Sequence, residues 1–236
     1  QYDEAFDVEQ LKLETKHNAG FVAGTLVHTD KGLFPIQDIK VGDKVLSRDE
    51  NNPNGELVYK SVLKTIKTPN QEVFRLSYWA RNQYDADEPI INYIIATRDH
   101  PIWNEAQERW CPLIDMEIGN MLSISNKTDT TYHFLCNNKM YQSSNSKGVL
   151  YGFCERPLKD YLPVEIETIF EVTDEKIISY YNPLDVDKFQ PTNGLTLSYE
   201  EQCDIARNSL DEALLCDVYN IEVEDYHTYF VGEEGV

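Results

Sequence analysis

Three segments of the chain carry residue types that can hold a peptide bond or move protons beside it. The first is the uncharged run at 20–28, Gly-Phe-Val-Ala-Gly-Thr-Leu-Val-His. The second is Thr97-Arg98-Asp99-His100, in which a hydroxyl and an imidazole are three positions apart. The third is Val-Tyr-Asn-Ile-Glu-Val at 218–223, with His-Thr-Tyr-Phe-Val-Gly at 227–232. A Thr-x-x-His pair alone is more often a turn-capping hydroxyl and a hydrogen-bonded core histidine. The elements around the three segments therefore decide how they are interpreted.

Those elements are predicted to be short strands. Residues 56–68 and 72–79 are rich in Val, Ile, Thr, Tyr and Phe, and 22–29 alternates loosely. Residues 90–96 form a β-branched apolar run with the length of a buried strand, which would end just before Thr97. Turn residues recur every ten or so positions, as in Asn-Asn-Pro-Asn-Gly at 51–55. Many short strands with frequent turns predict an all-β sandwich, barrel or meander.

An internal repeat sharpens this prediction. Residues 35–43, Pro-Ile-Gln-Asp-Ile-Lys-Val-Gly-Asp, match residues 112–120, Pro-Leu-Ile-Asp-Met-Glu-Ile-Gly-Asn, at a constant offset of 77. Pro, Asp and Gly are identical at equivalent places and the apolar positions correspond. Each copy predicts a one-turn helix or tight corner, with Pro fixing the entry and Gly supplying the exit angle. Two such corners imply two pseudo-equivalent β subdomains.

Composition excludes several classes of partner and cofactor. The net charge of −20 and the pI of about 4.5 disfavour nucleic acid, because an acidic surface repels phosphates. No run of 18 apolar residues exists, so no membrane span is expected. The cysteines are odd in number and form no CxxC pair, so we expect free thiols, with no disulfide framework, metal site or other cofactor. They are Cys111, Cys136, Cys154, Cys203 and Cys216.

Taken in order, the three segments resemble the Hint superfamily, which contains inteins, hedgehog autoprocessing domains and bacterial pretoxin-type Hint domains. The short sequences Val-Ala-Gly-Thr and Tyr-Phe-Val-Gly-Glu-Glu-Gly-Val are most similar to the pretoxin branch. The resemblance implies an all-β, pseudo-two-fold horseshoe that cleaves its own chain by a cysteine-type N–S acyl shift. It places the scissile bond between Ala19 and Gly20. It makes Thr97 the residue that orients the peptide or the histidine, and His100 the general acid for the departing nitrogen.

The chain departs from the family pattern at the nucleophile. The family has Cys, sometimes Ser, where this chain has Gly20, which offers no nucleophile. The family also continues to a His-Asn pair beyond the position of Val236. We therefore expect a trapped precursor or an inactive form.

The remaining polar residues of the three segments receive weaker assignments. The resemblance gives His227 a part in the second step, while the residues alone equally allow an exposed loop histidine. Inteins often have Asp where this chain has Asn220, and Asn cannot act as an acid or base, which speaks against a role. His28 is expected to be structural, and His17 and His133 belong to no motif.

The resemblance also divides the chain. Residues 1–19 would be a flanking, extein-like segment, residues 20–125 and 216–236 the Hint domain, and residues 126–215 an α+β insertion of unknown role. Within the insertion, 164–170 alternates as a strand does. A capping box at Ser198 and helical apolar spacing predict a helix near 199–215. The expected partner is the flanking polypeptide itself, with a C-terminal toxin domain or its immunity protein in a longer parent. Such a parent would be located in the bacterial cytoplasm or secreted.

Two alternatives stay open. The domain could keep the Hint shape as a non-cleaving scaffold or interaction module. It could also be an unrelated all-β protein that binds an apolar or sugar ligand, as its 15 Tyr and 3 Trp allow. The latter predicts that Gly20, Thr97 and His100 lie far apart.

Overall fold

The computed structural model describes residues 18–82, 90–117, 119, 121–122, 130–144, 150–156, 165–172, 177–181, 212–233 and 235–236. The described part is almost entirely β, as the sequence predicts. Its elements are β1 (Phe21–Val22), β2 (Leu26–Thr29), β3 (Gly32–Pro35), η1 (Ile36–Asp38), β4 (Lys44–Ser47), β5 (Val58–Asn82), β6 (Ile90–Thr97), β7 (Pro101–Asn104), β8 (Arg109–Pro112), η2 (Leu113–Asp115), β9 (Met121–Leu122), β10 (Thr130–Ser144), β11 (Leu150–Arg156), β12 (Glu165–Val172), β13 (Ile177–Tyr181) and β14 (Leu215–Val223).

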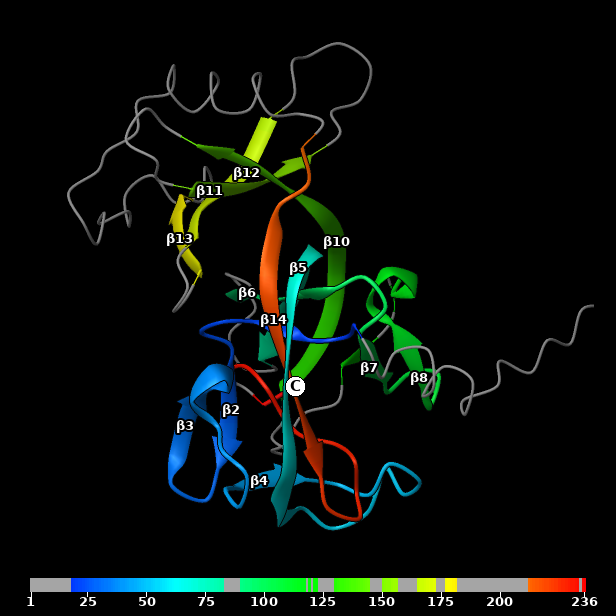
Figure 1. Ribbon diagram of the computed structural model, residues 1–236. Coiled ribbons are helices and arrows are strands. Elements are labelled where there is room, and N and C mark those ends of the chain that lie inside the picture. The colour runs from blue at the N-terminus through cyan, green and yellow to red at the C-terminus, as the bar shows by residue number, and fades with distance from the viewer. Residues whose placement is uncertain are drawn as a thin grey trace, which may run out of the picture.

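Long antiparallel strands form the spine of the molecule (Figure 1). The 25-residue strand β5 pairs with β4, β6, β10 and β14 along its length, and the sheet runs β13-β12-β11-β10-β5-β14-β1-β6. The β2–β3 and β7–β8 hairpins lie on opposite sides of this spine (Figure 1). Two strands predicted separately at 56–68 and 72–79 are thus one strand, which continues past the positive-φ residue Asn70, where its pairing with β14 shifts register.

The two repeated corners have the same backbone, which confirms the prediction from the nine-residue repeat. Pro35 (φ −58°, ψ 138°) begins η1 and Pro112 (φ −55°, ψ 143°) begins η2. Each corner contains one 3₁₀ turn and then a glycine at positive φ, 92° at Gly42 and 99° at Gly119. The strands before and after the corners, β3 with β8 and β4 with β9, start at the same offset as the prolines. The structural repeat therefore extends beyond the nine residues that match in sequence.

Strand β1 is short and central. Phe21 pairs with Tyr219 of β14 on one side and with Ala96 of β6 on the other. The strand predicted over 22–29 is divided by a turn at 23–25, so β1 joins the main sheet while β2 forms a separate hairpin. The Ala19–Gly20 peptide lies directly before β1, which is held between β14, near the C-terminus, and β6, from the middle of the sequence.

The main core fills the space between the corners and the long strands. It contains both corners' leading apolar residues, Ile36 and Leu113, and the central aromatic Phe21. Cys111 and Cys216 are buried, Cys136 is half-buried, and all three are free thiols. Burial raises the pKa of the Cys216 thiol to about 12, which leaves it without nucleophilic character at neutral pH.

Predictions for the region before β14 had mixed outcomes. The strand predicted at 164–170 is confirmed as β12. The helix predicted near 199–215 is wrong at its end, because Ala213 bridges Tyr141 and Leu215 begins β14. The bridge from Ala213 to β10 and the pairing of β14 with β5 override the helical spacing of the apolar residues. The rest of the segment for which that helix is predicted, 199–211, and residues 1–17 lie outside the described residues. Among the described residues, no helix is long and apolar enough to cross a membrane.

Candidate active site

The nitrogen end of the Ala19–Gly20 peptide is bound by Thr97. The Gly20 N–H donates to Thr97 Oγ1 at 3.2 Å, and the Thr97 N–H donates to the Gly20 carbonyl at 3.0 Å. Thr97 is buried at the end of β6, and Ala19 and Gly20 are buried beside it. Because both bonds are sequestered from water, Thr97 fixes the orientation of this peptide relative to the sheet.

The carbonyl end of the same peptide is bound by Asn220 on β14. Asn220 Nδ2 donates to the Ala19 carbonyl oxygen at 3.1 Å. The other side of the carboxamide accepts two bonds, from the Tyr229 hydroxyl at 2.7 Å and the Ile221 N–H at 2.8 Å. Burial raises the pKa of Tyr229 well above its ordinary value, so its hydroxyl stays a donor at neutral pH. The sequence speaks against a role for Asn220 because an amide cannot act as an acid or base, and its hydrogen bond to the Ala19 carbonyl is seen only in the structure.

His100 packs against the residue after the peptide. Its ring lies 4.1 Å from the Phe21 ring, centroid to centroid. The backbone N–H of His100 closes the 97–100 turn by donating to the Thr97 carbonyl at 3.1 Å. Burial lowers the pKa of His100 to about 3, so the imidazole is neutral at neutral pH. Nδ1 is buried and has no hydrogen-bond partner among the described residues. A neutral, unpaired imidazole can take up a proton and then return it.

The other histidines occupy different surroundings. His227 is exposed in the loop after β14, has a φ of 55°, and still lines the cavity that contains Ala19 and His100. His28 Nε2 lies 2.8 Å from the Gly232 carbonyl oxygen, a contact that ties β2 to the C-terminal segment. His133 stacks on Trp79 at 4.8 Å, away from these residues.

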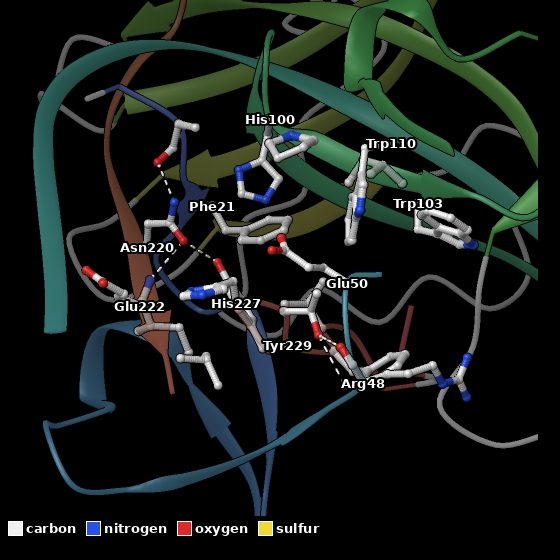
Figure 2. Close-up of a pocket in the computed structure, with 18 of the residues that line it drawn as sticks. Phe21, Arg48, Glu50, His100, Trp103, Trp110, Asn220, Glu222, His227 and Tyr229 are labelled. Carbon is white, nitrogen blue, oxygen red and sulfur yellow. Dashed lines mark hydrogen bonds between the residues drawn. The ribbon is translucent and has the colours of Figure 1, made fainter. Parts of the chain in front are cut away.

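A cavity of about 660 Å³ is lined by Ala19. Figure 2 shows Asn220, His227 and Tyr229 on one side of it and the indoles of Trp103 and Trp110 on the other. Charged side chains come from the loop after β4, and Val236 also lines the wall. The cavity thus combines an aromatic wall with a polar edge at the peptide. The described residues contain no group of three or more His, Cys, Asp or Glu arranged for a metal ion.

Gly20 is packed too tightly for a side chain in this backbone. A Cβ built on Gly20 would lie 2.8 Å from the Tyr219 carbonyl oxygen and 3.0 Å from the Tyr219 nitrogen. Both are backbone atoms, so relief requires β1 and β14 to separate locally. The distance between these strands in the structure is therefore the one that glycine allows.

Comparisons with known proteins identify the class. The structure resembles the bacterial intein-like domain from Clostridium thermocellum, with a TM-score of 0.50, 20% identity, and coverage of 92% of this chain and 95% of that one. The DnaB intein from Synechocystis sp. PCC 6803 matches with a TM-score of 0.47, 11% identity, and coverage of 92% and 96%. No curated protein matches. The profile of the pretoxin HINT domain matches residues 26–147, and the chain belongs to this family of intein-like self-processing domains.

Proposed function

We propose that this domain binds its own Ala19–Gly20 peptide in the geometry of an N–S acyl shift and leaves it uncleaved because Gly20 lacks a nucleophile. Hydrogen bonds at both ends of one peptide support the proposal: Thr97 accepts from the nitrogen and Asn220 donates to the carbonyl oxygen. Acyl transfer needs contacts at these two atoms, because the nitrogen must leave and the oxygen must take up negative charge.

His100 completes the proposed chemistry. With a thiol at position 20, a neutral imidazole would take the thiol proton as sulfur attacks the Ala19 carbonyl carbon. It would then return that proton to the Gly20 nitrogen as the carbon–nitrogen bond breaks. The low pKa of the buried ring keeps the imidazole unprotonated before the first transfer and makes its protonated form a strong acid for the second. His227, at the exposed edge of the cavity, would act in a later step that resolves the thioester.

The domain division and partners follow from the same proposal. Residues 1–19 are the flanking segment on which the site acts, 20–125 and 216–236 form the Hint domain, and 126–215 an insertion. The substrate is the chain's own flanking polypeptide. A toxin domain, or the immunity protein that recognises it, is the further partner that the pretoxin family implies.

A non-cleaving holder of the N-terminal segment is the second candidate function. The close approach of the Tyr219 backbone to Gly20 favours it, because a site adapted to glycine has no room for a nucleophile. In this case the same hydrogen bonds serve to anchor residues 1–19 permanently.

The substitution Gly20→Cys separates the two functions. We expect the protein to stay full length as it is, and the variant to release residues 1–19 when dithiothreitol or hydroxylamine is added, as read by mass spectrometry. The variant should also lose about 1–3 kcal/mol of unfolding free energy through crowding at Tyr219. His100→Ala in that background should slow release on the order of 100-fold or more. His133→Ala, which removes a histidine outside the cavity, is the matched control.

The outcomes are distinguishable. A folded Gly20→Cys protein that stays intact would contradict the self-processing proposal and favour the holder. Equal release rates for the His100→Ala and His133→Ala variants would remove His100 from the chemistry.

A further inference from the structure

The Asn220 carboxamide donates a hydrogen bond to the carbonyl oxygen of the proposed scissile bond. We infer that Asn220 is a catalytic residue that stabilises negative charge on the Ala19 oxygen during acyl transfer, and that Tyr229 is the residue that positions it. The inference rests on the proposed function, because it assigns a role in the reaction proposed there.

The orientation of the carboxamide is fixed by its neighbours. Oδ1 faces two donors, the Tyr229 hydroxyl and the Ile221 N–H, so Nδ2 must face the Ala19 oxygen. The reversed amide would oppose donor to donor at Ile221 and acceptor to acceptor at Ala19. The network therefore selects one orientation and holds the Nδ2 donor in place before any reaction.

The neutral amide suits the task. In the acyl shift, sulfur of a thiol at position 20 forms a bond to the Ala19 carbonyl carbon, and the carbonyl π electrons move to oxygen. Collapse of this intermediate breaks the carbon–nitrogen bond, and the Gly20 nitrogen takes the thiol proton carried by His100. A carboxamide has no charge to repel the oxyanion and keeps its N–H bonds at every pH of interest. A fixed donor in a buried site needs no reorganisation when the charge develops.

Tyr229 acts on the reaction through Asn220. Its hydroxyl bonds to Oδ1 and its ring packs edge-on against Phe21, at 6.0 Å between centroids. It makes no hydrogen bond to the Ala19–Gly20 peptide, so its removal should loosen the amide without deleting the donor.

Isotope labelling tests the contact in the protein as it exists, with no cleavage needed. The chain contains two Ala–Gly pairs, Ala19–Gly20 and Ala23–Gly24. Labelling with [¹³C′]alanine and [¹⁵N]glycine therefore gives two carbonyl-correlated amide signals, and the second pair is an internal control. We expect Asn220→Leu to move the Ala19 ¹³C′ resonance upfield, as a carbonyl that loses a donor does, while the Ala23 resonance stays. Tyr229→Phe should produce a smaller shift in the same direction, and Tyr59→Phe, at an exposed position of β5, none.

An unchanged Ala19 resonance in folded Asn220→Leu would overturn the inference. If Asn220→Leu does not fold, Tyr229→Phe decides in its place, and an unmoved Ala19 signal there has the same meaning.

Kinetics test the catalytic role in the Gly20→Cys background. Removing an oxyanion donor costs on the order of 100- to 1,000-fold in rate, and we expect this loss in thiol-dependent release for Asn220→Leu. Tyr229→Phe should slow release less, and Tyr59→Phe should leave it unchanged. Failure of Gly20→Cys itself to cleave would contradict the proposed function, while the labelling result would still report on the Asn220 contact. Cleavage that Asn220→Leu does not slow would overturn this inference alone.

Discussion

The two repeated halves have nearly the same backbone at their corners and different residues at their common centre. The offset that relates Pro35 to Pro112 also relates Gly20 to Thr97, and these two residues bind each other by a pair of hydrogen bonds. A two-fold axis relating the copies would pass between them. One half thus supplies the peptide and the other supplies the hydroxyl that binds it.

The same asymmetry continues three residues later. His100 of the second half is buried at the position that Ala23 occupies in the first. Both halves therefore have the residues that make the corner, Pro, the buried apolar positions and Gly, whereas at this equivalent position only the second half has a titratable side chain.

The largest expected effect tests whether the corners contribute equally to stability. Ile36 and Leu113 are equivalent residues, 2% and 0% exposed, in one continuous core. Ile36→Ala and Leu113→Ala should each cost about 2–5 kcal/mol of unfolding free energy, because each leaves a cavity in close-packed surroundings. Urea unfolding of the two variants measures both costs. A loss below about 1 kcal/mol at one corner only, short of this range, would show that the halves are not mechanically equivalent.

The second effect should arise from one half only. His100 is neutral in the folded protein down to a pKa of about 3, whereas in the unfolded chain it takes a proton below its ordinary pKa of 6.5. Between these values the unfolded state binds one more proton, so stability falls as the pH falls, by about 1.4 kcal/mol per unit from this residue. From pH 6.5 to 5 the loss should be about 2 kcal/mol by the same relation.

Unfolding curves across this pH range measure that dependence. His100→Ala should flatten the pH dependence. His133→Ala, which removes a histidine of the same sheet outside the cavity, should not. Identical slopes in the parent and in His100→Ala would mean that the imidazole is hydrated or charged in the folded state.

Much of the fold of the two halves can be predicted from the sequence because the corners are encoded locally. Pro and Gly at fixed places dictate a 3₁₀ turn and its exit, and β-branched runs dictate strands. The continuity of β5 and the start of β14 at Leu215, where the apolar spacing predicts a helix, are decided by pairing between distant segments, which no local pattern records. Thr97 could be found because it belongs to a motif. The hydrogen bond from Asn220 to the Ala19 carbonyl could not, because it depends on β1 lying beside β14.

The smallest effect concerns the glycines that end the corners. Gly42 and Gly119 have φ values of 92° and 99°, and a Cβ built at either would meet no atom within 4 Å. Alanine at these positions is therefore disfavoured by backbone conformation alone, at a cost on the order of 1 kcal/mol. Gly42→Ala and Gly119→Ala should lower the urea midpoint by similar amounts. Because neither position contacts the cavity, the Ala19 and Ala23 carbonyl resonances should stay where they are in both variants. A shift of the Ala19 resonance in one variant alone would show that its corner, and not only the strand pairing, sets the geometry of the peptide at the axis.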